Sequence, residues 1–532
     1  MLDRRTLLAG IGALAGKALP VPALARAGTG VTGTADRRPG PLVKTAYGTV
    51  RGYRANGVHV FRGLRYGAAT GGVNRFRPPV KPAPWTGVME AVTDGPRAPQ
   101  QPVSTGPGES TPPSSEDCLF INLFTPAVND AGKRPVMVWV HGGGYGQGAG
   151  SDPRFDGSNL ARDNDVVVVS LNHRLNAFGH LYLGELLGPD YADSGNVALL
   201  DIVAVLEWVR DNIGQFGGDQ RNVTLFGHSS GGSKISALMA MPAAAGLYHK
   251  VIIESGATLK VRTLEAAVLA TDKALAVLGL SRDTARQVLT LPTEAFLPFG
   301  TMVGNVGSGP VVDGRSLPRQ PFEPDAPPTA AGIPLLIGSA ETEMTVSAQP
   351  ADFTLTMDAL RARMAPQLGD RLDSVLAAYQ AGRPRATPSE LYFFLTADLR
   401  TTRPTHIQAE RQARQNGGAV YLYRMAWRTL VDGGRLMSPH GIELPFVWNN
   451  LAIAGGLVGH GADLQPMATR MSRMWAAFAR SGDPNIAGHV HWDRFTPERR
   501  ATMVFNVDDH LVDDPYKAER EALRTVPPGP FG

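Results

Sequence analysis

The stretch 223–232 constrains the fold of this chain more than any other part of its sequence. An apolar, β-prone run ends at Gly227, and a segment with helical spacing of apolar residues follows directly. Between them lies the pattern Gly-x-Ser-x-Gly, in which a strand reverses into a helix and holds the central serine in a strained backbone conformation. Gly227 and Gly231 lack the Cβ atoms that would keep strand and helix apart. The pattern makes Ser229 the candidate nucleophile and excludes Ser230, because position 228 is histidine rather than glycine.

Apolar runs around this stretch predict a layered fold. Continuous apolar runs are typical of strands covered on both faces, and they occur at 135–140, 165–171, 223–226, 251–253, 333–337 and 420–423. Helical spacing over 197–213 separates the second run from the third. Strands that alternate with helices predict an α/β fold with a central, mostly parallel sheet flanked by helices. Helical patterns at 264–297 and 352–413 predict helical insertions over the active site.

A glycine run, His141-Gly142-Gly143-Gly144, comes directly after the first of these predicted strands. Attack of a serine on a carbonyl carbon creates an oxyanion, which must be met by N–H donors that are already oriented. A glycine run lets the backbone curl so that consecutive N–H groups point into one cavity. We expect the N–H groups of Gly143, Gly144 and Ser230 to form this oxyanion hole.

A serine nucleophile also needs a base and an acid. His440 is the candidate base, because a neutral imidazole accepts a proton well near pH 7. It lies in a predicted turn after the last predicted strands, which fits the chain order serine, acid, histidine. The acid is expected just past the 333–337 strand, where Glu341 and Glu343 compete and spacing alone does not choose. We expect at least one of these two glutamates to be a solvated surface charge.

These motifs and several others resemble the type-B carboxylesterase (cholinesterase-like) family of the α/β-hydrolase fold. The resemblance covers nearly the whole chain after the start, and it includes segments at 61–63, 115–122, 172–179, 195–219, 310–314, 338–343, 440–446 and 478–485. Aligning the family's acid motif on Gly338 selects Glu343. The resemblance implies a serine carboxylesterase that cleaves small-molecule carboxylic esters through an acyl-serine intermediate, with Ser229, Glu343 and His440 as its triad. It implies no metal and no cofactor.

The chain departs from the family pattern at three positions beside these motifs. His228 replaces the glutamate that usually precedes the nucleophile, Ser230 replaces an alanine, and Met344 replaces the glycine that follows the acid. We weigh two interpretations of His228: a neutral packing residue, or a group that titrates at about pH 6 to 7 and favours anionic substrates. Cys118 matches a half-cystine of the family, but it is the only cysteine of the chain.

Two other functions use or abandon the same motifs. Hydrolysis of amides or carbamates would need the same triad and oxyanion hole. A non-catalytic binding protein is the alternative from another class, because the family includes adhesion proteins that have lost the nucleophile. Retention of the serine, histidine, acid and glycine run argues against that alternative.

The first residues predict export. Arg4-Arg5 precedes an apolar stretch at 7–19 and small residues near 23–27, as in a twin-arginine signal peptide spanning 1–27. We expect a flexible lead-in at 28–42, one domain at 43–532, and a periplasmic or secreted protein. The formal net charge is only +4 and no dense Lys/Arg block occurs, so we expect no nucleic-acid partner. No later run is long enough to predict a stable membrane span, and the sequence indicates no oligomeric state.

Overall fold

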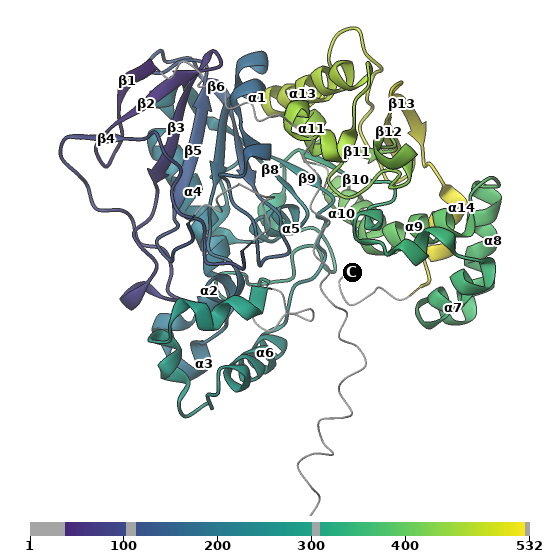
Figure 1. Cartoon of the computed structure of the whole chain (residues 1–532), viewed down its shortest axis with the longest axis horizontal. Helices are drawn as coiled ribbons and strands as arrows, with labels where there is room; N and C mark the ends of the chain where they lie inside the picture. The colour runs from purple at the N-terminus through teal and green to yellow at the C-terminus, as the bar shows by residue number, and fades with distance from the viewer. Residues whose placement is uncertain (1–37, 103–112, 301–308, 416, 527–532) are drawn as a thin grey trace, which may run out of the picture.

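A computed structural model describes residues 38–102, 113–300, 309–415 and 417–526 (Figure 1). The predicted signal peptide and residues 28–37 of the predicted lead-in lie outside these ranges. Residues 38–42 were also assigned to the lead-in, and there the prediction is wrong. They belong to strand β1 (Arg38–Lys44), which pairs antiparallel with β2 (Thr49–Ala55). Main-chain hydrogen bonds to a neighbouring strand impose this order, and a polar composition does not reveal them.

One sheet of 13 strands forms the centre of the molecule, in the order β1-β2-β3-β5-β7-β6-β8-β9-β10-β11-β12-β13, with β4 paired to β2. The remaining strands are β3 (Val58–Arg65), β4 (Val88–Glu90), β5 (Phe120–Thr125), β6 (Arg134–Val140), β7 (Val167–Leu171), β8 (Gly218–His228), β9 (Lys250–Glu254), β10 (Leu335–Ala340), β11 (Val420–Met425), β12 (Ala501–Phe505) and β13 (His510–Asp513). All pairings from β7 through β12 are parallel. The pairings on the two flanks are antiparallel, except that β4 pairs parallel with β2. This confirms the predicted α/β fold.

The central strands are buried on both faces, as their continuous apolar runs predict. In β6, alternate side chains enter two different cores, because successive residues of a strand point to opposite faces. Val136 and Val138 pack in one core with residues of α4 (Val197–Asn212) and α5 (Ser230–Leu238). Met137 and Trp139 pack in the other with residues of α13 (Leu464–Ser481). The sheet therefore has helices packed on both of its faces.

The remaining helices are α1 (Ser158–Asn164), α2 (Asn176–His180), α3 (Gly184–Leu187), α6 (Leu264–Val277), α7 (Met357–Leu368), α8 (Leu372–Gly382), α9 (Pro388–Ala397), α10 (Arg403–Ala413), α11 (Leu444–Val447), α12 (Gly455–Val458) and α14 (Lys517–Leu523). In Figure 1, α6 lies low on the left with α2 and α3, and α7, α8 and α9 lie on the right. These two groups have small cores of their own. The last helix of the second predicted insertion, α10, instead contacts strands β10 and β11.

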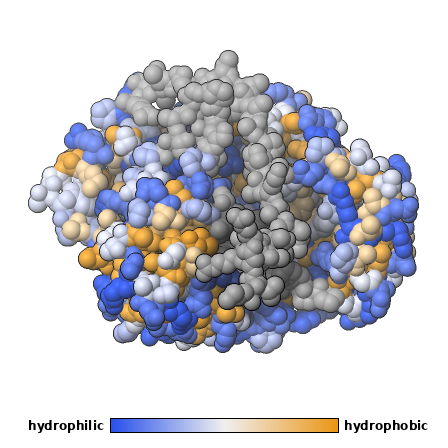
Figure 2. All heavy atoms as spheres, turned by 60° about the horizontal axis from the view of Figure 1, so that its bottom comes forward, coloured by the Kyte–Doolittle hydropathy of each residue, from blue (hydrophilic) through white to orange (hydrophobic). Residues whose placement is uncertain are grey.

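The surface is mixed in polarity. Figure 2 brings the lower end of Figure 1 forward and shows polar residues over much of the described surface, with apolar residues gathered toward the left. Two large apolar side chains of α6, Leu269 and Val277, are exposed. Of the helices in the described ranges, none combines the length and the apolar character that a membrane crossing requires.

Candidate active site

Ser229 lies at a sharp turn between β8 and α5. Its φ of 57° and ψ of −131° are strained for a residue with a side chain. The two glycines of the motif are needed here: a Cβ on Gly231 would lie 2.0 Å from the carbonyl oxygen of Val140, and one on Gly227 would lie 2.7 Å from the same atom. The N–H group of Ser229 donates to the Glu254 carbonyl at 2.8 Å, which fixes the turn on the neighbouring strand.

The glycine run after β6 packs directly against this turn. A Cβ on Gly142 would lie 2.7 Å from the carbonyl oxygen of His228. Gly143 and Gly144 have φ values of 109° and 63°, which suit glycine far better than other residues. The Tyr145 N–H donates to the Ser230 hydroxyl oxygen at 3.3 Å, so the loop is tied to the first residue of α5. Within the described ranges, the N–H groups of Gly143 and Gly144 donate to no protein acceptor.

Glu343 and His440 form a buried pair beyond β10. His440 Nδ1 hydrogen-bonds to Glu343 Oε2. Their backbones are joined too, because the His440 N–H donates to the Glu343 carbonyl at 2.9 Å. The Glu343 side chain is fully buried, whereas that of His440 is 25% exposed. Glu343 itself has a φ of 28°, a strained value that aims its carboxylate at the imidazole.

The same sheet edge gathers all of these residues. Strands β6, β8 and β10 belong to the parallel part of the sheet, so the glycine run, Ser229 and Glu343 all follow carboxyl ends of strands. His440 reaches this edge from a segment between β11 and α11. The ring of His228, the residue before Ser229, lies with its centroid 4.3 Å from the His440 ring, which brings the imidazole to the turn.

The pKa of His440 is raised above its usual 6.5. Burial alone would lower it, but the charge of the Glu343 carboxylate and the hydrogen bond that the imidazole donates to it outweigh burial. An imidazole held this way is a stronger base than a free one, and Glu343 stabilises its protonated form.

Further carboxyl groups lie behind this pair. The Ser255 hydroxyl donates to Glu343 Oε1 at 2.6 Å and lies 3.3 Å from Glu443 Oε1. Burial, and then the charge of Glu343, raises the pKa of Glu443 to about 7. Burial, and then the charge of Glu443, raises the pKa of Glu254 to about 8. Near neutral pH Glu254 is therefore mostly protonated, and Glu443 is protonated in about half of the molecules.

The sequence reasoning missed Glu254, Ser255 and Glu443, although signals for them existed. Glu254 and Ser255 directly follow the apolar run at 251–253, so the rule that located the acid after another strand would have found them. Glu443 lies in the segment 440–446 that carries part of the family resemblance.

Glu341 lies in a different environment from its neighbour Glu343. It is 3.5 Å from Arg424 Nε and 3.9 Å from Arg383 Nη2, and it accepts a hydrogen bond from the Tyr516 hydroxyl at 3.3 Å. Its side chain is only 10% exposed. The expectation that one of the two glutamates is a solvated surface charge is therefore wrong. Two arginines compensate Glu341 inside the protein, whereas Glu343 meets the histidine.

The hypothesis that His228 titrates at about pH 6 to 7 is also wrong. Burial, followed by the charges of His440 and Arg154, lowers its pKa well below 6.5. His228 is only 7% exposed. His228 is thus a neutral residue that packs on the His440 ring, in agreement with the plainer interpretation.

The expected position of His440 in the chain needs one correction. Two strands, β12 and β13, follow it and extend the sheet, although His440 was placed after the last strand. The run 501–505 is short and mixed in polarity, so the search for continuous apolar runs did not find it. The order serine, acid, histidine is unaffected.

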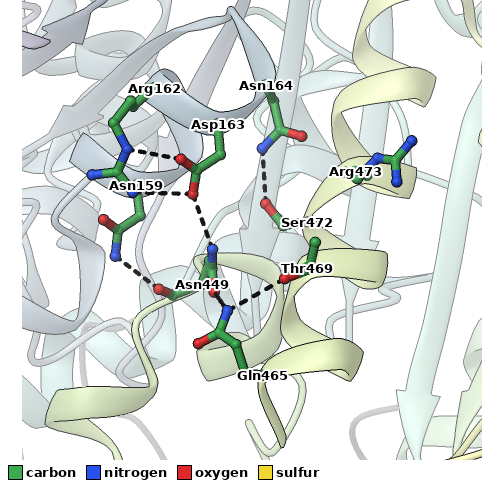
Figure 3. Close-up of a pocket in the computed structure, with 9 residues that line it drawn as sticks. All are labelled: Asn159, Arg162, Asp163, Asn164, Asn449, Gln465, Thr469, Ser472 and Arg473. Atoms are coloured by element: carbon green, nitrogen blue, oxygen red, sulfur yellow. Dashed lines mark hydrogen bonds and ion pairs between the residues drawn. The ribbon is translucent and has the colours of Figure 1, made fainter. Parts of the chain in front are cut away.

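A separate surface hollow of about 410 Å³ lies between α1 and α13 (Figure 3). Its lining is polar: Asn159, Arg162, Asp163, Asn164, Asn449, Gln465, Thr469, Ser472 and Arg473. Many of these groups bond to one another, as Asn164 does to Ser472 at 2.9 Å and Gln465 to Asn449 at 2.8 Å. None of the residues around Ser229 lines it. In the described part of the chain, no group of three or more His, Cys, Asp or Glu side chains is arranged to hold a metal ion.

A strained serine after a central strand, a glycine loop on the neighbouring strand and a histidine–carboxylate pair at the same sheet edge define an α/β-hydrolase. Comparison with known proteins then gives the family. The Carboxylesterase family model matches residues 39–523, so the chain belongs to the carboxylesterase family and is a carboxylic ester hydrolase. This confirms the resemblance found in the sequence.

Several relatives match over most of their length. The para-nitrobenzyl esterase of Bacillus subtilis (strain 168) is 34% identical over 496 residues, which cover 91% of this chain and 98% of that protein. The liver carboxylesterase of Sus scrofa is 31% identical, with 86% and 88% covered. The crystal structure of the Geobacillus stearothermophilus carboxylesterase EST55 has a TM-score of 0.81 at 36% identity, with 90% of this chain and 99% of that chain covered.

Proposed function

We propose that the protein is a serine carboxylesterase with Ser229 as nucleophile, His440 as general base and Glu343 as the acid that orients His440. The N–H groups of Gly143, Gly144 and Ser230 form the oxyanion hole. The observation that carries this proposal is the buried Glu343–His440 pair at the sheet edge where Ser229 sits in a strained turn. The N–H groups of the two glycines, which donate to no acceptor among the described residues, support it further.

Each step uses groups that lie at this edge. Glu343 occupies Nδ1 of His440, which leaves Nε2 to take the proton of the Ser229 hydroxyl as its oxygen attacks the ester carbonyl carbon. The negative charge that develops on the carbonyl oxygen is met by the three N–H groups. His440 then gives its proton to the departing alcohol as the ester C–O bond breaks. A water molecule then attacks the carbonyl carbon of the acyl-serine and gives a proton to His440. The bond between this carbon and the Ser229 oxygen breaks, the carboxylic acid leaves, and His440 returns the proton to the Ser229 oxygen.

The test compares Ser229→Ala with Ser230→Ala on nitrophenyl and nitrobenzyl esters of graded acyl length. Because the members of a triad act as a unit, Ser229→Ala should lower kcat by about 10⁴-fold or more. Ser230→Ala keeps its backbone N–H and should stay within about tenfold of the wild type. An organophosphate should label the wild type and Ser230→Ala, but not Ser229→Ala. Stoichiometric labelling of another residue would contradict the assignment of Ser229 as the nucleophile.

The same assay separates ester hydrolysis from the alternatives. Matched nitroanilides and carbamates, run beside the esters, would reveal an amide or carbamate hydrolase by a higher kcat/KM. A folded wild type that neither turns over any ester nor reacts with the organophosphate would indicate a binding protein.

We also propose that residues 1–27 direct export through the twin-arginine route to the periplasm or the medium. The paired Arg4-Arg5, the short apolar stretch and the small residues after it support this. Cys118, the only cysteine, is buried and unpaired, so folding requires no disulfide. Replacing both arginines by lysine should retain the uncut protein in the cytoplasm, as fractionation and N-terminal sequencing would detect. Processing that is unchanged by this replacement would contradict the route.

A further inference from the structure

Lys234 is buried beside the proposed oxyanion hole, and no acidic side chain among the described residues pairs with it. It lies on α5, the helix that begins directly after Ser229, and the residue is 0% exposed. A buried ammonium normally has a carboxylate partner, because leaving water is costly for a charge. Here the only hydrogen-bond acceptor in the described ranges is a backbone carbonyl. A buried lysine in such a place, next to the proposed nucleophile, therefore indicates a function.

Its contacts bracket the glycine loop. Nζ donates to the His141 carbonyl at 3.4 Å, a long hydrogen bond at the residue before Gly142. Nζ also lies 5.2 Å from the centroid of the Tyr145 ring, and Tyr145 is the residue after Gly144. One side chain on the nucleophile helix thus touches both ends of the loop that carries Gly143 and Gly144.

The groups that face this ammonium are neutral or positive. His141 and His173 stack with centroids 4.5 Å apart, and His180 lies against Tyr145 at 5.4 Å. Burial, and then the charge of Lys234, lowers the pKa of His141 to about 3 and that of His173 well below 6.5. Burial, and then the charges of nearby cations, does the same to His180.

One more positively charged group, Arg262, belongs to this cluster and comes from the segment after β9. The guanidinium of Arg262 donates from Nη2 to the His180 carbonyl at 2.9 Å. Burial lowers its pKa to about 10. Burial also raises the pKa of the Tyr145 hydroxyl to about 12, so it carries no charge at neutral pH. The charge of Asp152 acts on His141 in the direction opposite to burial, but no carboxylate among the described residues pairs with Lys234.

We infer that Lys234, in its protonated form, is a positioning residue that ties both ends of the glycine loop to the nucleophile helix. The inference rests on the proposed function, since it gives Lys234 a part in shaping that oxyanion hole. A hydrogen bond at one end and a cation–π contact at the other limit how far the two glycine N–H groups can drift. The oxyanion hole depends on such preorganisation, and a small displacement of its donors slows the reaction.

The inference predicts a dependence on pH. Burial lowers the pKa of Lys234 to about 7, so the ammonium is present below that pH and is lost above it. The cation–π contact disappears with the charge. Turnover of the wild type should therefore fall as pH rises through the lysine pKa, in addition to the rise that accompanies deprotonation of His440 at lower pH.

The test measures kcat and KM of wild type and Lys234→Met for a nitrophenyl ester from about pH 6 to about pH 9. At the acidic end, Lys234→Met should lower kcat by about tenfold and leave KM within about twofold. The ratio of variant to wild-type kcat should rise toward one at the alkaline end, where the wild-type lysine is neutral. A purely structural role would lower the ratio equally at every pH.

Two further variants complete the design. Tyr145→Leu removes the ring but not the lysine, and it should shift the descending limb of the wild-type profile to lower pH. Lys250→Met is the matched control, because Lys250 is a buried lysine at the other end of the parallel strands, bonded to Asn222. It should keep the wild-type profile. Organophosphate labelling and a melting curve establish that each variant is folded.

The outcomes separate the two proposals. A Lys234→Met variant with wild-type kcat at the acidic end would overturn the role of Lys234. A wild type without a descending limb would overturn it too, even if Lys234→Met proved hard to fold. A wild type that hydrolyses no ester and takes no organophosphate label would overturn the proposed function instead.

Discussion

The sheet edge around Ser229 and the hollow between α1 and α13 are both rich in polar groups, but the two regions treat them differently. At the sheet edge, the Glu343 carboxylate is buried, Ser229 has a strained backbone, and the N–H groups of the loop glycines donate to no acceptor among the described residues. In the hollow, many of the side chains are exposed and hydrogen-bond to one another. The hollow has a volume of about 410 Å³, yet many of its polar groups are already satisfied by one another.

The two regions differ in the features that mark a reactive site. Burying polar groups and straining the backbone both cost free energy, and a fold tolerates that only where packing over-determines the arrangement. The Gly227 and Gly231 contacts and the strands beneath them supply this packing. The size and polarity of a hollow do not by themselves indicate a reactive site.

The largest of these effects is expected when Glu343, rather than its neighbour Glu341, is replaced by glutamine. Glu343→Gln removes the charge that orients and stabilises the His440 imidazolium, so kcat should fall by about 10³- to 10⁴-fold. Because that charge also raises the pKa of His440, the acidic limb of any residual activity should move to lower pH. Steady-state kinetics over a pH series measures both changes.

Glu341→Gln is the matched control for that experiment. It should keep kcat within a few-fold and lower the free energy of unfolding by about 1 to 3 kcal/mol, since it weakens a buried contact with two arginines. Denaturant titration measures this loss. The opposite ranking of the two variants in kcat would exchange their roles.

A smaller effect concerns His228, which contacts His440. His228→Glu places a carboxylate against the imidazole, and an opposite charge at this distance should raise the pKa of His440 by about one unit. The acidic limb of kcat/KM should therefore move to higher pH by that amount. His228→Gln should leave the limb in place, because His228 is neutral in the native protein. A limb that moves in His228→Gln would show that His228 carries charge after all.

The smallest effect is expected in the hollow, and it bears directly on the comparison. Arg473→Met and Asn449→Ala should both leave kcat and KM within about twofold of the wild type, because among the described residues no hydrogen bond or ion pair joins either of them to the groups around Ser229. The same nitrophenyl ester assay applies. A loss of tenfold or more in either variant would mean that the hollow and the sheet edge are coupled.

The sequence by itself determined the elements whose signals are local. The glycines around Ser229 impose a strand-to-helix turn through contacts within a few residues, and the run at 141–144 needs glycine for its own backbone angles. Continuous apolar runs located β6, β7 and β8, because burial on both faces leaves a pattern in the strand itself. His440 was identified from its position in chain order and its chemistry.

Tertiary structure decided what depends on distant neighbours. Glu341 and Glu343 follow the same strand, and only the fold brings two arginines to one and a histidine to the other. The charge state of His228 likewise depends on burial and on His440, which lies far away in the sequence. Lys234 carries no sign of its environment in the local sequence, because folding brings its neighbours from the segments just after β6 and β7 and from α2. A pKa is set by solvation and by charges in space, and neither quantity is written in a local pattern.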